Sequence, residues 1–170
     1  MALELFFLRH AVAVERGAEG ITDEARPLTE EGREKMILAV QGMGRLKIEF
    51  EVLLSSPLLR AKQTAELVAR HLPFRGPVEF EEELEPGGDL RVLLGKLAAR
   101  RESRYLLVGH EPMLGSWIRS LLGWRGVARL RLKKGALCHL LLEGLQAGAG
   151  AELIELFQPK ALRLLGRKPR

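Results

Sequence analysis

The chain has 170 residues, of which 46% are hydrophobic and 29% charged, a balance typical of a folded globular domain. A membrane-spanning helix needs roughly 20 consecutive apolar residues, and no stretch of the sequence reaches that length. Glu4 precedes the first apolar run and Arg9 closes it, unlike a secretory signal, so we expect a cytoplasmic protein. Cys138 is the one cysteine, which excludes a disulfide within the chain.

The net charge of +5 and the isoelectric point of about 9.7 favour anionic partners, either nucleic acid or phosphate esters. Nucleic acid is the weaker alternative, because only 5% of the residues are aromatic and single-stranded nucleic acid is bound largely by stacking. The basic residues are spread along the chain, except for a cluster near the C-terminus that we expect to be solvated. The chain contains no asparagine, which is compatible with a heat-adapted source.

The first half of the chain alternates predicted strands and helices. An apolar run at 3–9 predicts a buried strand, and the polar residues 11–28 after it predict a long loop. Thr29 is a favourable N-cap, and apolar residues at helical spacing predict a helix from there to about residue 46. A second apolar run at 51–55 predicts another strand, and Pro57 suits the first position of the helix that follows.

The second half begins with a short predicted edge strand at 78–80 and an acidic loop that contains glycine at 81–88. A helix capped by Asp89 follows. After it we expect a strand at 105–109, a helix at 112–122, a loop at 123–134 and two β-runs at 136–142 and 152–157. This order predicts an α/β fold, a three-layer α/β/α sandwich whose mainly parallel sheet ends in an antiparallel edge hairpin. We expect one domain over residues 1–160 and a basic C-terminal tail over residues 161–170.

Side chains that can bind an anion follow the ends of the predicted strands. In chain order they are Arg9 with His10, Arg26, Ser56 with Arg60, and His110. Open α/β sheets bind ligands at the carboxyl ends of their strands, so these side chains should share one crevice. Arginine forks match phosphate oxygens, and a neutral imidazole nitrogen can accept a phosphoryl group. One histidine could therefore be a nucleophile and the other its electrostatic partner.

Three motifs in this order resemble the signature of the histidine phosphatase superfamily, the phosphoglycerate mutase-like fold. They are Arg9-His10-Ala11, the run from Ser56 through Arg60 to Gln63-Thr64, and Gly109-His110. The segment Arg26-Pro27-Leu28-Thr29 and the short chain resemble the bacterial phosphohistidine phosphatase branch. Ala11 stands where the family usually has glycine, which a backbone without positive φ tolerates.

The resemblance implies a metal-independent phosphatase that uses no cofactor. His10 would be the nucleophile that accepts the phosphoryl group, and Arg9, Arg60 and His110 would bind the phosphoryl oxygens. Arg26 would be a further phosphate contact. Phosphoryl transfer depends mainly on positioning and on stabilising charge at these oxygens, which arginine and histidine side chains can provide.

The general acid is less well determined by the motifs than the nucleophile. The resemblance makes Glu83 the best candidate, with Glu85, Asp89 or solvent as alternatives. A phosphohistidine substrate needs an acid less, because its imidazole leaving group can be protonated from solvent before the P–N bond breaks. Ser56 either caps the helix at Pro57 or contacts phosphate, and Glu111 is a further candidate for substrate binding.

The favoured substrate is phosphohistidine on a protein, and the alternative is a small phosphate ester such as a sugar phosphate. Relatives in this branch lack the helical insertion that roofs the active site in enzymes acting on sugar phosphates. We therefore expect a shallow, open groove around His10 that admits a side chain of another protein. A phosphoprotein-binding module without turnover is the non-enzymatic alternative, which the intact His10 disfavours. The oligomeric state does not follow from the sequence.

Overall fold

The computed structural model describes residues 2–126, 130–144 and 150–167. Its sheet has six strands in the order β3-β2-β4-β1-β5-β6, and in chain order they span Leu3–Arg9, Val52–Ser55, Val78–Phe80, Arg104–Gly109, Leu137–Leu142 and Ala151–Phe157. The first four strands run parallel, whereas β5 pairs antiparallel with both β1 and β6. The predicted parallel sheet with an antiparallel edge hairpin is confirmed.

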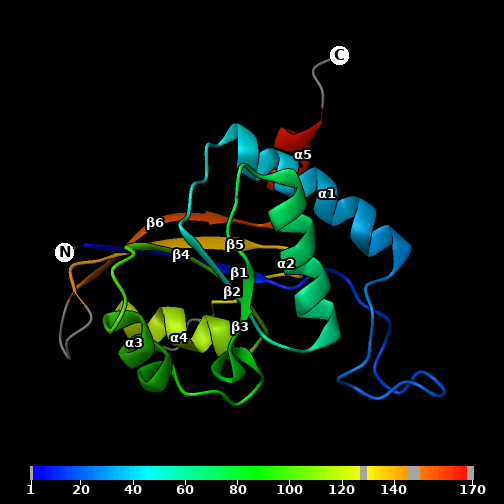
Figure 1. Ribbon diagram of the computed structural model, residues 1–170, viewed down its shortest axis with the longest axis horizontal. Helices are drawn as coiled ribbons and strands as arrows, with labels where there is room; N and C mark the ends of the chain where they lie inside the picture. The colour runs from blue at the N-terminus through cyan, green and yellow to red at the C-terminus, as the bar shows by residue number, and fades with distance from the viewer. Residues whose placement is uncertain (1, 127–129, 145–149, 168–170) are drawn as a thin grey trace.

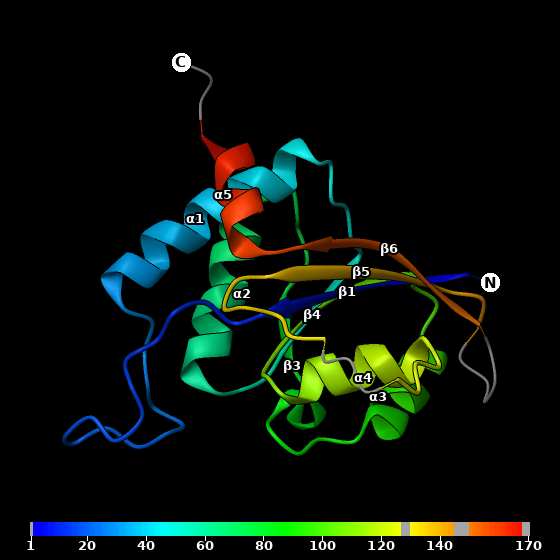
Figure 2. The same ribbon diagram turned by 180° about the vertical axis from the view of Figure 1, so that it is seen from behind.

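Helices cover both faces of this sheet, as Figures 1 and 2 show. One face carries α1, α2 and α5, which span Glu30–Arg45, Leu59–His71 and Pro159–Gly166. The other face carries α3 and α4, which span Leu90–Ala98 and Met113–Leu121. A short 3₁₀-helix, η1, at Glu82–Leu84 lies between β3 and α3. The three-layer α/β/α sandwich expected from the sequence is confirmed.

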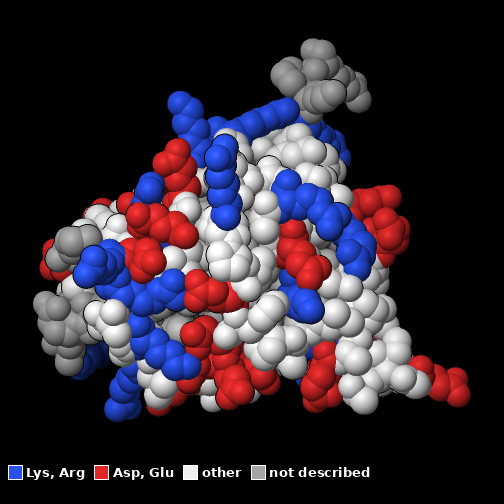
Figure 3. All heavy atoms as spheres, viewed as in Figure 1, with Lys and Arg blue, Asp and Glu red and all other residues white. Residues whose placement is uncertain are grey.

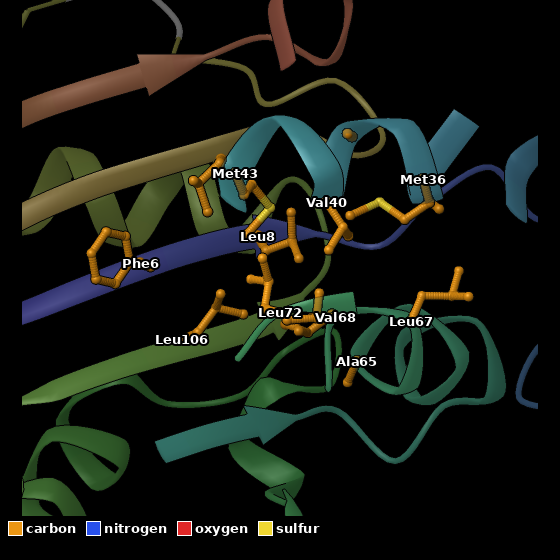
Figure 4. Packing of buried hydrophobic residues seen from close by; sticks show 14 of the residues in the cluster. Phe6, Leu8, Met36, Val40, Met43, Ala65, Leu67, Val68, Leu72 and Leu106 are labelled. Atoms are coloured by element: carbon orange, nitrogen blue, oxygen red, sulfur yellow. The ribbon is translucent and has the colours of Figure 1, made fainter. Parts of the chain in front are cut away.

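The alternation of side chains along β1 builds two cores at once. Phe6 and Leu8 pack toward α1 and α2 and belong to the same core cluster as Met36 and Val40 (Figure 4). Their neighbours, of which Phe7 is fully buried, pack toward α3 and α4 on the opposite face. A strand covered on both faces reads as a continuous apolar run, which is why 3–9 was recognisable. Each such side chain contributes about 1.5–3 kcal/mol through burial.

The helix starts show where local signals hold and where they fail. Thr29 Oγ1 accepts a hydrogen bond from Gly32 N at 3.0 Å, and Asp89 accepts one from Arg91 N at 2.7 Å, so both predicted caps are confirmed. The expected start of α2 at Pro57 is wrong, because Leu58 is still extended and the helix begins at Leu59. Two further residues of turn are needed to bring the chain from the end of β2 onto the sheet face.

Helix α5 is not predicted from the sequence; residues up to Gly166 form this helix rather than a frayed end, although Leu164 and Leu165 are exposed. The helix begins at Pro159, buries Leu162 and packs against α1. Contact is close because two glycines remove side chains from the interface: a Cβ at Gly42 would lie 2.1 Å from Leu162 O, and one at Gly166 would lie 1.8 Å from Leu38 O. Residues 168–170 of the expected tail lie outside the described residues.

No helix in the described parts of the chain is long and apolar enough to cross a membrane. Lysine and arginine are interspersed with aspartate and glutamate over the face seen in Figure 3. The positive net charge is therefore not gathered into one continuous basic surface on that face, as a nucleic-acid-binding surface would require.

Candidate active site

The register of the sheet brings the two signature histidines together. Strands β1 and β4 are parallel neighbours in which Arg9 pairs with Gly109, so His10 and His110 both follow at the same edge. Their ring centroids are 5.0 Å apart, and His10 N donates to Gly109 O at 3.1 Å. Strand β2 lies on the other side of β4, and Ser56 N donates to Val108 O at 2.9 Å. The two histidines therefore lie side by side at the carboxyl ends of β1 and β4, as the sequence predicts.

His10 is held as a neutral imidazole in one tautomer. Its Nδ1 lies 2.7 Å from Ala11 O, and because a carbonyl oxygen only accepts, Nδ1 carries the proton. Nε2 then has a free electron pair. Burial, with the side chain only 5% exposed, lowers the pKa of His10 well below its ordinary value, and the neighbouring His110 lowers it further. His10 is therefore neutral at pH 7 and has the form that a nucleophile needs.

His110 is oriented by Ser56. A hydrogen bond of 2.9 Å joins His110 Nε2 to Ser56 Oγ, and Ser56 Oγ also accepts from Leu58 N at 3.3 Å. Ser56 thus caps the turn before α2 and orients a histidine, and both groups are buried. Burial, followed by the positive charge of Arg60, lowers the pKa of His110 to about 3. His110 is consequently also neutral at pH 7.

Arg26 and Arg60 converge on Asp23, a residue that sequence reasoning missed. Arg60 donates from Nη1 to Asp23 O at 2.7 Å and from Nη2 to Asp23 Oδ2 at 3.3 Å. Arg26 Nε donates to Asp23 Oδ1 at 2.9 Å, and Arg16 Nε reaches the same oxygen at 3.0 Å. Burial acts to raise the pKa of Asp23, but the hydrogen bond from Arg16 and the charges of Arg60 and Arg26 outweigh it and lower the pKa. The Asp23 carboxylate is therefore ion-paired with Arg26 and Arg60, two of the arginines that the sequence predicts to bind phosphate.

The remaining residues of the Arg60 motif hold the loop over the site. Thr64 Oγ1 accepts from Ala11 N at 3.0 Å and donates to Arg60 O at 2.7 Å. Gln63 Oε1 accepts from Leu28 N at 2.8 Å, so Gln63 ties the loop before α1 to α2. Ala11 is tolerated because, among the described residues other than glycine, only Lys47 has positive φ. The hydrogen bonds of these motif residues therefore hold α2 against the chain that follows β1.

Arg9 and Glu111 are linked through the segment that precedes β5. Arg9 Nη1 donates to Leu132 O at 2.8 Å, while Glu111 Oε1 accepts from Leu132 N at 2.8 Å. Burial lowers the pKa of Arg9, and the negative charge of Glu111 opposes that effect. Burial lowers the pKa of Lys134, a residue that the sequence did not single out, and the positive charge of the nearby Arg9 lowers it further. Glu111 thus holds a cationic segment beside the site.

Glu83 does not have the surroundings of a general acid. Its carboxylate forms an ion pair with Lys96 Nζ at 2.7 Å, and Glu81 binds the same ammonium group at 2.6 Å. The hydrogen bond from Lys96 lowers the pKa of Glu83, whereas a general acid working at neutral pH needs a raised one. Of the alternatives, Asp89 is engaged as the N-cap of α3.

His10, the nucleophile that the resemblance implies, is less accessible than expected. The side chains of His10 and Arg60 are 5% and 2% exposed, and the loop that contains Asp23 lies beyond the carboxyl end of β1 (Figure 1). Asp23 draws residues 11–28 onto the buried arginines, which accounts for this low exposure. An open groove lies beside Arg9.

Comparison with known proteins agrees with this geometry. Residues 5–86 match the family model of the histidine phosphatase superfamily (branch 1). An uncharacterized protein of Picosynechococcus sp. is 37% identical over 165 residues, which cover 94% of this chain and 99% of that protein. Phosphohistidine phosphatase SixA of Escherichia coli is 31% identical over 122 residues, or 70% of this chain and 74% of SixA.

The solved structures include the protein histidine phosphatase SixA complexed with tungstate. It superposes with a TM-score of 0.79 and 27% identity over 94% of this chain and 99% of that chain. The span matched to the family contains Arg9, His10, Arg26 and Arg60, and the fold adds His110 from the neighbouring strand. The chain belongs to the histidine phosphatase superfamily, as a phosphatase of its SixA-like, phosphohistidine phosphatase branch.

Proposed function

We propose that this phosphatase removes the phosphoryl group from phosphohistidine on a protein, through a covalent phosphohistidine intermediate on His10. The observation that carries the proposal is the fixed tautomer of His10, which leaves Nε2 unprotonated beside buried arginines. SixA, which is named for action on phosphohistidine, is 31% identical to this chain. A cytoplasmic location stays a prediction from the sequence.

The reaction proceeds in two phosphoryl transfers. His10 Nε2 forms a bond to phosphorus as the P–N bond of the substrate breaks, and the leaving imidazole takes its proton from solvent. Water then attacks the phosphorus on His10, which releases inorganic phosphate and restores the neutral imidazole. Arg9, Arg26, Arg60 and His110 stabilise the equatorial oxygens in both steps.

The incoming phosphoryl group replaces the Asp23 carboxylate as the anion on Arg26 and Arg60. This exchange keeps the arginine charges compensated before and after binding, which limits the cost of burying them. The arginines supply the positive charge that a metal ion contributes in other phosphatases, so the proposed reaction needs no metal or cofactor. The ion-paired Glu83 is also compatible with a leaving group that needs no acid from the protein.

Rapid quenching with a ³²P-labelled phosphohistidine protein tests the intermediate. Wild-type enzyme should retain label that is acid-labile and base-stable, and His10→Ala should retain none. His139→Ala is the matched control, because His139 lies in β5 and is hydrogen-bonded to Glu4 at 3.1 Å. Undiminished label on His10→Ala would exclude His10 as the acceptor.

A substrate panel tests the choice of phosphohistidine. We expect kcat/KM to be higher for a phosphohistidine protein or peptide than for aryl or sugar phosphates, with no loss in excess EDTA. A sugar phosphate turned over near the diffusional limit of about 10⁸ M⁻¹s⁻¹ would establish the small-metabolite alternative instead. Activity lost in EDTA and restored by a divalent ion would refute metal independence.

A further inference from the structure

A groove of about 560 Å³ lies beside the catalytic residues, between the first turn of α4 and residues 130–131. Three of its lining side chains are arginines, namely Arg9, Arg119 and Arg131, and we refer to it as the arginine groove. Gly115 forms part of its wall, where a Cβ would lie 2.6 Å from Leu130 O. The close approach of α4 to this segment therefore depends on glycine.

The arginine groove shares Arg9 with the proposed site of phosphoryl transfer. Arg9 belongs to both, since it precedes His10 at the end of β1 and also lines the groove. Glu111, which follows His110, lines the groove as well. A molecule whose phosphoryl group reaches His10 would therefore extend its neighbouring atoms into the groove.

The charge of the groove is positive even after Glu111 is counted. Glu111 Oε1 accepts a hydrogen bond from Leu132 N, so one of its two carboxylate oxygens is already bound to the backbone beside the groove. Arg131 is exposed, and Arg119 reaches Gly126 O through Nη2 at 3.4 Å. Two arginines thus face an open groove without an acidic ion-pair partner among the described residues. Such a site suits a carboxylate, which arginine binds through its planar fork.

We propose that the arginine groove binds an acidic side chain of the substrate protein close to its phosphohistidine, and so selects substrates whose phosphohistidine has acidic neighbours. This inference rests on the proposed function, because it assigns the groove to the flanks of the same substrate. The groove is open to solvent, so the contribution acts mainly on binding and weakens with salt, as charges beyond about 8 Å are screened at physiological ionic strength.

Two phosphohistidine peptides that differ only in their flanks provide the test. One carries two glutamates on each side of the phosphohistidine, and the other carries glutamine at the same positions. Wild-type kcat/KM should favour the acidic peptide by about threefold to tenfold at low salt, mainly through KM. Arg131→Gln and Arg119→Gln should each reduce this preference, and the double variant should abolish it.

Arg75→Gln is the matched control. Arg75 is exposed and lies between α2 and β3, at the opposite edge of the sheet from the catalytic histidines, so its loss should leave the preference intact. Equal rates on the two peptides, or a preference that persists in the double variant, would overturn the inference while the proposed function stands. Failure to turn over either peptide, with aryl phosphate still hydrolysed, would reject the proposed substrate and the groove's role together.

Discussion

His10, the proposed nucleophile, is held in one tautomer by the backbone rather than by a separate acid–base side chain. The carbonyl of Ala11 fixes the proton on Nδ1, and burial keeps the ring neutral. A Ser-His-Asp triad needs a carboxylate to hold its histidine in the correct tautomer. A nucleophilic imidazole with a lowered pKa needs only an acceptor for its second nitrogen, which the peptide group supplies.

Arg60→Ala should reduce kcat/KM by about 10²–10³-fold, because a buried charge at the phosphoryl oxygens is worth about 3–4 kcal/mol in the transition state. Arg75→Ala, at an exposed position away from the site, should change kcat/KM little. Steady-state kinetics on aryl phosphate, with folding checked by circular dichroism, measures both. Similar losses in the two variants would place the phosphoryl group elsewhere.

Asp23→Asn should make inorganic phosphate a tighter inhibitor. The carboxylate competes with phosphate for Arg26 and Arg60, and an amide removes the competing negative charge at nearly constant volume. The competitive inhibition constant for phosphate should fall several-fold. Glu24→Gln is the control, since Glu24 is exposed beside it. A weaker affinity in Asp23→Asn would mean that Asp23 positions the arginines instead of competing for them.

At the scale of residues, the sequence predicts the proposed catalytic groups better than the groups that hold them in place. Arg9, His10 and His110 follow apolar strands and match a spaced motif, so they are recognisable without a structure. Asp23 sits in an irregular polar loop, where an aspartate on buried arginines looks like any solvated carboxylate. Its role depends on how the loop folds back onto α2, and no local periodicity encodes that path.

At the scale of elements, Gly42→Ala should destabilise the protein although alanine favours helix. Gly42 lies in α1, where a Cβ would meet Leu162 O at 2.1 Å and push α5 away. Overpacking costs about 1–3 kcal/mol, and a clash with backbone at 2.1 Å belongs at the upper end of that range, above the gain of about 1 kcal/mol in helix propensity.

Gly95→Ala provides the matched control for that substitution. Gly95 lies in α3 with nothing within 4 Å of an added Cβ, so the same change should stabilise the protein by up to about 1 kcal/mol. Urea denaturation measures both free energies of unfolding. Stabilisation by Gly42→Ala would show that α5 does not hold its close position on α1 in solution.

Predicting the helices themselves succeeded where apolar spacing and caps agreed, as at Thr29 and Asp89. Helix α5 was missed because its basic residues suggested a solvated tail, although Pro159 at its start is a helix signal. The helix is eight residues long, too short to be stable alone, so its existence depends on tertiary packing against α1.

At the scale of the whole molecule, acid should destabilise the ligand-free fold before most carboxylates titrate. Burial lowers the pKa of His10 and takes that of His110 to about 3, from about 6.5 in the unfolded chain. Below about pH 6.5 the unfolded chain binds protons that the folded chain does not, so the free energy of unfolding falls as pH falls. Each histidine contributes a slope of up to about 1.4 kcal/mol per pH unit.

Urea denaturation from pH 7 to about pH 4.5 measures this slope, and His110→Gln should reduce it. The carboxylate of Asp23, whose pKa is also lowered, adds its own loss of stability only at lower pH, as the unfolded chain begins to protonate near pH 4. An unchanged slope in His110→Gln would mean that His110 is not held neutral by the fold.

The position of β4 in the sheet has a consequence for the order of folding. Strand β4 lies between β1, which carries Arg9 and His10, and β2, which leads to Arg60, and β1 and β2 are not neighbours. The pairing of Arg9 with Gly109 joins positions 100 residues apart, a late contact because closing so long a loop is entropically unfavourable. An amino-terminal fragment that ends before β4 contains the first two motifs of the signature but has neither Gly109-His110 nor the strand that aligns them. During refolding, phosphatase activity should therefore return only with the docking of β4, so the first catalytic turnover marks the insertion of β4 between β1 and β2.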